Sequence, residues 1–257
     1  MSRLNHRRHW VSAIAVGLLA GLLALSAGST RAESMDLEKI LAALDSADPR
    51  ERREQTLQLL ADNSLELETI AQLLARARSH EQRHRLLGVA QHHVLRQRRE
   101  HVFDRPDRGS LGISHRTVAA EDLPDTPDHN GPAIEIVVTL PGFPAHGQLV
   151  AGDRVIAIDG EPLPPDFTAD HFRELIVNYR SGEKLHVTID RDGQRLDRTI
   201  ELASAQALGA MYDPNRLQLR PQFERDWQTA KGNLQIGEST EPESGPLQLR
   251  GAEISLD

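Results

Sequence analysis

The sequence contains no cysteine. This absence excludes disulfide bonds, thiol catalysis and lipid attachment through an amino-terminal cysteine, so packing alone must stabilise the folded chain. Aromatic residues make up only 4% of the 257 positions, and the formal net charge is -8. An acidic chain with few aromatic side chains is a poor binder of nucleic acid, and we expect no nucleic-acid partner.

Only one long apolar run occurs, at residues 11–27. It follows a basic segment and precedes a small-x-small cleavage site, which is the pattern of a secretory signal peptide over residues 1–32. We therefore expect an exported protein, periplasmic or secreted, with no stable membrane insertion after signal cleavage. An uncleaved amino-terminal membrane anchor is the alternative, although the run is shorter than the ~20 residues that usually span a bilayer.

Catalytic and cofactor motifs are absent with one exception. No G-x-S-x-G, phosphate-binding loop or dinucleotide fingerprint occurs, so we expect no cofactor. The exception is His80, Glu81 and His84, which match the H-E-x-x-H pattern of zinc peptidases. Neighbouring arginines oppose a dication and no clear third ligand follows, so we expect no metal site. A small zinc-dependent peptidase that uses this motif is the alternative function.

Residues 33–104 show the apolar spacing of short helices joined by short links. The dipeptide Asp48-Pro49 predicts one helix start, and Ser64 predicts another. Ser79 and Gln82 have the spacing of a capping box. The Asp-Pro-x-x-Arg start faintly resembles HEAT-type helix pairs, which implies a region of helical hairpins.

Residues 105–204 change to strand patterning. Asp192-Gly193 predicts a hairpin turn, and an amphipathic helix is expected at residues 168–179, with Phe172 and Ile176 as core residues. The predicted strands include residues 134–140, 155–158, 185–191 and 196–202.

Residues 205–257 are rich in Gln, Pro, Glu and Gly and predict a flexible carboxy-terminal tail. The chain therefore divides into a signal peptide, a helical region, a strand-rich domain and a tail. The expected fold class is α+β, with an all-α helical-hairpin segment ahead of the sheet.

Three ordered segments carry the most specific pattern of the sequence. They are Arg108-Gly109-x-Leu111-Gly112-Ile113; Leu149-x-Ala151-Gly152-Asp153-x-Val155-Ile156-x-Ile158-x-Gly160; and Gly182-x-Lys184-Leu185 with Arg191-x-Gly193. As a set they resemble a PDZ domain of the type found in bacterial periplasmic proteases, without an attached protease domain. The resemblance implies a small, partly open β-barrel with one main groove helix.

The resemblance also implies a site for the terminal carboxylate of a peptide, which would add as a strand to the domain. The implied carboxylate-binding residues are Arg108, Leu111, Gly112 and Ile113. The implied groove residues are Ser114, His171 and Leu175. A Gly112→Glu replacement is expected to abolish binding and leave the fold largely intact.

Together these expectations describe a non-catalytic, exported adaptor or scaffold. Its expected partner is a carboxy-terminal or extended peptide of another envelope protein. A purely structural role, with the groove occupied by the protein's own residues, is a further reading.

Overall fold

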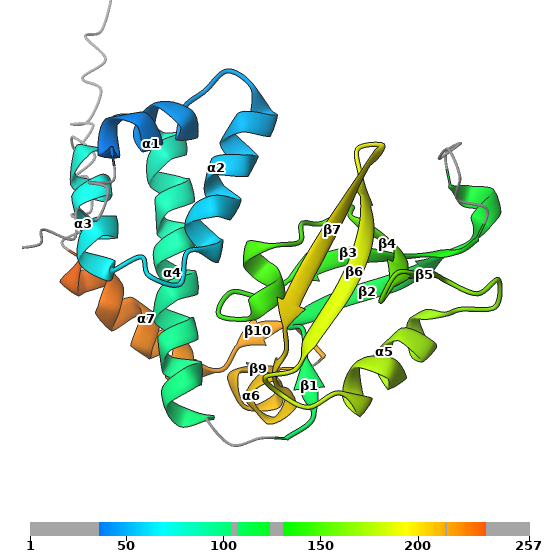
Figure 1. Ribbon diagram of the computed structural model, residues 1–257. Coiled ribbons are helices and arrows are strands. Elements are labelled where there is room, and N and C mark those ends of the chain that lie inside the picture. Colours follow the sequence, from blue (N-terminus) through cyan, green and yellow to red (C-terminus); the bar gives the residue numbers. More distant parts are fainter. Residues whose placement is uncertain (1–35, 104–106, 124–130, 214, 235–257) are drawn as a thin grey trace, which may run out of the picture. The chain divides into compact units, whose positions relative to one another are not determined.

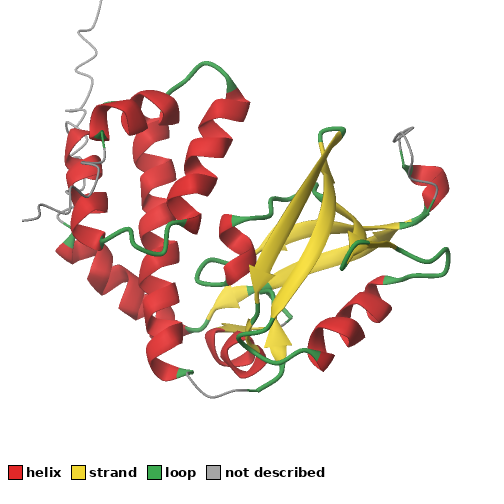
Figure 2. Ribbon diagram, viewed as in Figure 1, coloured by secondary structure: helices red, strands yellow, loops and turns green. Residues whose placement is uncertain are grey.

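The computed structural model describes residues 36–103, 107–123, 131–213 and 215–234 (Figure 1). The predicted signal peptide, residues 1–32, lies outside this part. Helices come first, and antiparallel strands with further helices follow (Figure 2), which makes the fold α+β. Among the described residues, every helix is too short or too polar to cross a membrane.

Capping residues mark the starts of two helices in the helical region, as predicted. It contains α1 (Leu37–Leu44), α2 (Pro49–Ala61), α3 (Leu67–Arg76) and α4 (His80–Val102). Asp48 caps α2 with Pro49 in its first turn, and Ser79 and Gln82 form the predicted capping box of α4. The start predicted at Ser64 is wrong. Ser64 donates to the Asp62 side chain at 2.6 Å, and α3 begins three residues later.

The prediction of a flexible tail from residue 205 is wrong for residues 205–213 and 215–233. Two helices, α6 (Ala205–Met211) and α7 (Pro221–Asn233), occupy most of this stretch. Phe223 and Trp227 lie one turn apart on α7 and are buried, Trp227 within the core of the helical region. Two well-placed aromatic side chains therefore anchor a helix in a segment of low apolar density. Residues 235–257 lie outside the described part.

The main sheet is antiparallel and open. Its strand order is β2-β3-β4-β6-β7, and β5 pairs with β4 alone. Its strands are β2 (Ile113–Val118), β3 (Ala133–Thr139), β4 (Arg154–Ile158), β5 (Glu161–Pro162), β6 (Lys184–Arg191) and β7 (Gln194–Glu201). Smaller pairs join β1 (Gly109–Ser110) with β8 (Ala203–Ser204), and β9 (Tyr212–Asp213) with β10 (Gln218–Leu219).

The predicted hairpin turn is present, and a helix lies close to the range predicted at residues 168–179. Asp192 and Gly193 both adopt positive φ, as a two-residue hairpin turn requires, and they connect β6 to β7. Helix α5 (Ala169–Asn178) has Phe172 and Ile176 buried in the core of the sheet domain, as expected.

The described residues, from Asp36 onward, form one compact unit. Helix α4 contacts the loop between β3 and β4, where Gly142 N–H donates to His92 Nδ1 at 3.0 Å. Nearby, a Cβ built on Gly147 would lie 2.9 Å from the backbone nitrogen of Ala61 on α2. The helical region and the sheet are therefore packed directly on one another.

Candidate functional site

The predicted carboxylate loop connects β1 to β2. Gly109 N–H donates to the carbonyl of Tyr179 at 2.7 Å, so the loop is fixed to the end of α5. Gly112 has a φ of 70°, a left-handed conformation that favours glycine. Leu111 between them is only 2% exposed. Its side chain packs in the core of the sheet domain and therefore does not line a ligand pocket.

One of the three amides predicted to bind a carboxylate is already hydrogen-bonded. Gly112 N–H donates to Ser110 Oγ at 3.2 Å. A serine hydroxyl that accepts from the amide two residues later is a common turn device, and the PDZ-like pattern leaves that position unspecified. In the part of the chain that the structure describes, Leu111 N–H has no hydrogen-bond partner. The site therefore keeps a free amide before Gly112.

Gly112 is covered by Phe143. A Cβ at position 112 would lie 2.2 Å from Cβ and Cγ of Phe143, which is far closer than any real contact. The expectation that Gly112→Glu would spare the fold is therefore wrong, because any side chain there displaces a fully buried aromatic ring.

Strand β2 is an end strand of the main sheet, and its outer edge lies on the side of α5. Leu140 N–H donates to Gly112 O at 2.8 Å beside the Ile113–Thr139 pair. In an antiparallel ladder such a bond flanks a non-hydrogen-bonded pair, so the N–H and C=O of Ile113 point away from β3.

The same orientation recurs at His115. This residue is opposite Ile136, whose own N–H and C=O bond to Asp153 and Gly152 on the β4 side, at 2.8 Å each. The main-chain groups of His115 therefore also face outward. Among the described residues no strand pairs with this edge.

The predicted groove residues have different positions. Ile113 and Leu175 are half-buried and pack against the same core, so they can border an apolar groove. Ser114 directs its main-chain groups towards β3, and the pleat places its side chain on the opposite face from Ile113. His171 is exposed and accepts from Thr168 N–H at 3.3 Å within the capping box of α5. Its ring is therefore part of the helix start.

Two residues that the sequence analysis missed connect β2 to the start of α5. His115 Nε2 lies 3.1 Å from the carbonyl of Ala169, and its ring contacts Phe172 edge-to-face at 5.1 Å. Thr117 Oγ1 accepts from Ala169 N–H at 2.7 Å. Burial lowers the pKa of His115, so it is neutral at pH 7. The alternation of Ile113, His115 and Thr117 on one face was the available signal.

Two arginines lie beside each other at the start of the predicted carboxylate loop. Arg108 is exposed, as expected, and its backbone forms an isolated antiparallel bridge with Arg180. This bridge is next to Gly109 and the free amide of Leu111, so two arginines border the loop. Arg180 was not identified from the sequence, because only the fold brings it beside Arg108.

The H-E-x-x-H motif is engaged in ion pairs. Glu81 Oε1 accepts from Arg85 Nε at 2.7 Å and lies 3.5 Å from Arg52 Nε. The hydrogen bond and charge of Arg85 lower the pKa of Glu81. The rings of His80 and His84 stack with centroids 6.3 Å apart. No group of three or more potential metal ligands is found in the described residues.

The comparisons with known proteins give one weak likeness. No family model and no curated protein matches the sequence. Two solved structures of the HtrA-type protease AlgW with a decapeptide are similar to parts of the chain. One, a variant, is 21% identical with a TM-score of 0.31 and covers 43% of this chain and 33% of that chain. The other is 24% identical with a TM-score of 0.30 and covers 37% of this chain and 29% of that chain.

Proposed function

We propose that this protein is a non-catalytic, PDZ-like binding protein that adds an extended or carboxy-terminal peptide as a new strand along β2. The observation that carries the proposal is the outward orientation of the main-chain groups of Ile113 and His115. An unpaired edge of this kind is a template for strand addition. The signal-peptide pattern of residues 1–32 supports a partner in the periplasm or outside the cell.

The groove sets the length and end of the peptide. The bonds of His115 and Thr117 to Ala169 limit the free edge to about the first three residues of β2. At the other end, the amides of Leu111 and Ile113, with the charges of Arg108 and Arg180, suit a terminal carboxylate. Half-buried Ile113 and Leu175 suit an apolar last side chain. The ligand is thus a short, apolar carboxy terminus.

Calorimetric titration with a library of carboxy-terminal peptides tests this function. We expect free-acid peptides to bind about tenfold or more tightly than the same peptides with an amidated end, because the amide removes the charge that the loop binds. Equal affinity of the two forms, or no binding of either, would contradict the proposal.

A variant pair tests the location. Leu175→Asp places a carboxylate in the groove and should abolish binding of free-acid peptides. Gln97→Asp adds the same charge at an exposed position of α4 and should leave the affinity unchanged. Loss of binding in both variants, or in neither, would locate the site elsewhere.

The zinc-peptidase alternative is separable by metal analysis. The ion pairs of Glu81 support the non-catalytic reading, because a carboxylate held by Arg85 and Arg52 is a weak general base. We expect the purified protein to contain no stoichiometric zinc and to cleave no peptide. Stoichiometric zinc lost on His84→Ala would favour the peptidase instead.

A further inference from the structure

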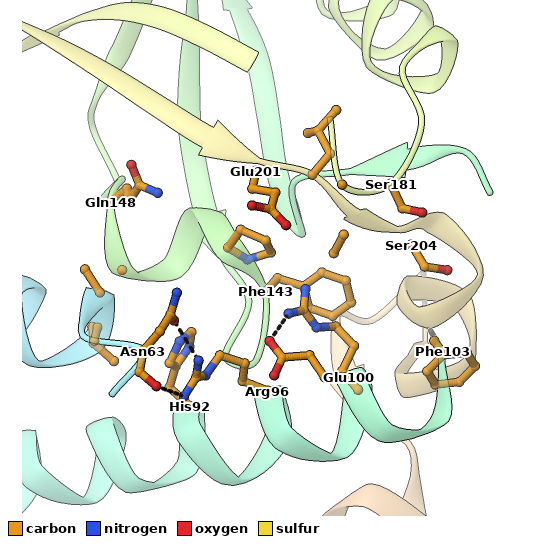
Figure 3. Close-up of a pocket in the computed structure, with 18 residues that line it drawn as sticks. Asn63, His92, Arg96, Glu100, Phe103, Phe143, Gln148, Ser181, Glu201 and Ser204 are labelled. Carbon is orange, nitrogen blue, oxygen red and sulfur yellow. Dashed lines mark hydrogen bonds and ion pairs between the residues drawn. The ribbon is translucent and has the colours of Figure 1, made fainter. Parts of the chain in front are cut away.

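A cavity of about 430 Å³ lies where α4 meets the sheet domain (Figure 3). Arg96 and Glu100 lie on its α4 side, and Gln148 and Glu201 lie on its sheet side. Its volume is within the range of small-molecule sites. None of the proposed peptide-binding residues lines it.

Two arginines of α4, Arg96 and Arg99, line this cavity. Arg99 is only 9% exposed, and its Nη2 donates to Glu100 Oε1 at 3.0 Å. Arg96 Nη1 donates to Asn63 Oδ1 at 2.7 Å. The Nε atoms of both arginines are buried and have no hydrogen-bond partner among the described residues. Because they are three residues apart, the two side chains share one face of the helix.

These unpartnered donors need an acceptor. A buried donor on a charged group is strongly unfavourable without one, and native structures rarely leave such groups unsatisfied. The guanidinium of Arg99 also lies over the Phe143 ring, 5.6 Å from its centroid, so packing holds it in place. The charged side chain of Arg99 is therefore held in place beside the cavity.

A third donor comes from His92, which also lines the cavity. Its Nδ1 accepts from Gly142 N–H, so the neutral ring must carry its proton on Nε2. Burial keeps the pKa of His92 well below its usual value and the ring neutral. The α4 side of the cavity is thus rich in donors.

We propose that this cavity binds a small molecule through a carboxylate or phosphate group held by Arg96 and Arg99. Glu100 already pairs with Arg99, and Glu201 on the sheet side opposes a second negative charge. Glu201 and Gln148 instead suit a cationic or hydrogen-bond-donating group at the other end of the ligand. An amino acid fits this charge pattern better than a dianion does.

Thermal melting and calorimetry of the full chain test the site, with L-glutamine, succinate and inorganic phosphate each used alone. We expect at least one probe to raise the melting temperature and to bind one per chain. The amino acid should do so most strongly. If only inorganic phosphate raises the melting temperature, the bound anion is a phosphate and the site is still supported.

Variants on the same helix locate the binding. Arg99→Met should lower the affinity for the probe by about tenfold or more, because it removes a charged hydrogen bond. Arg83→Met, at an exposed position of α4 outside the cavity, should not change the affinity. Arg96→Met serves as a second test if Arg99→Met does not fold. If no probe raises the melting temperature, the proposed site is wrong. If the rise persists in both cavity variants, the probe binds elsewhere and the proposal is equally contradicted. Peptide titrations are unaffected by this outcome.

Discussion

At the scale of single residues, the close contact of Gly112 with Phe143 determines the loop geometry. Gly112→Ala adds a methyl group 2.2 Å from Phe143 atoms at a positive φ, so it should destabilise the protein by about 2–4 kcal/mol. Gly152 also has a positive φ, but no atom lies within 4 Å of a Cβ built there. Gly152→Ala should therefore lower the free energy of unfolding by only about 1 kcal/mol. Urea unfolding of both variants measures the difference, and equal losses would contradict this packing.

Ser110 competes with the proposed ligand for one amide. Ser110→Ala removes the acceptor at 3.2 Å from Gly112 N–H and leaves that amide free for a carboxylate. We therefore expect free-acid peptides to bind Ser110→Ala about three- to tenfold more tightly, with no gain for amidated peptides. Calorimetry measures both affinities. Weaker binding of the free acids would show that the hydroxyl itself contacts the ligand.

The residue scale also shows where sequence reasoning succeeded and failed. Arg108, Ile113 and Leu175 were identified from a family-like pattern; Ile113 and Leu175 are half-buried and pack against the same core, and Arg108 is exposed. The pattern could not reveal that Ser110 binds the Gly112 amide or that Phe143 covers that glycine. Both are contacts made by side chains at positions that the motif leaves open.

At the scale of elements, a cluster of histidines joins α4 to the turn η2 (Pro144–Gly147). The rings of His92 and His146 stack 5.2 Å apart, and His93 Nε2 bonds to the carbonyl of Leu59 at 2.8 Å. Burial lowers the pKa of all three, that of His146 to about 4. Arg96 and Arg99 also face this cluster and oppose its protonation.

This cluster predicts acid-sensitive stability. The folded state holds these histidines below the unfolded pKa of about 6.5, so the unfolded state binds more protons between pH 6.5 and pH 4. The free energy of unfolding should be highest above pH 6.5 and should decrease as the pH falls. His146 accounts for up to about 3 kcal/mol of this decrease. Urea unfolding at pH 7 and pH 5 measures the loss.

Matched variants identify the source of the pH effect. His146→Gln should reduce the pH dependence, whereas His101→Gln, at an exposed position near the end of α4, should not. An unchanged loss in His146→Gln would assign the effect to other groups. The helix caps at Asp48 and Ser79 were predictable because they are local, but this cluster joins distant segments and has no sequence signature.

At the scale of the whole molecule, the last helix completes the core of the first four. Trp227 of α7 is 7% exposed and belongs to the core cluster formed by residues of α1, α2, α3 and α4. Since the described residues form one compact unit, we expect a single unfolding transition that includes both the helical region and the sheet.

Substitution of this anchor tests the prediction. Trp227→Ala should lower the free energy of unfolding by about 3–5 kcal/mol in that single transition. Arg225→Ala, at an exposed position of the same helix, should change it little. Separate transitions for helical and sheet signals would show that the two parts are independent. The tail prediction failed here because composition averages over a segment, whereas Phe223 and Trp227 act through their positions.

The central claim is that an incoming peptide pairs with the outward main-chain groups of β2. Amide hydrogen exchange, followed by NMR with and without a free-acid peptide, tests it directly. The account predicts that the peptide slows exchange at Ile113 and His115 and leaves Ser114, already paired with β3, nearly unchanged. Unaltered exchange at Ile113 and His115 in a peptide-saturated sample would contradict it.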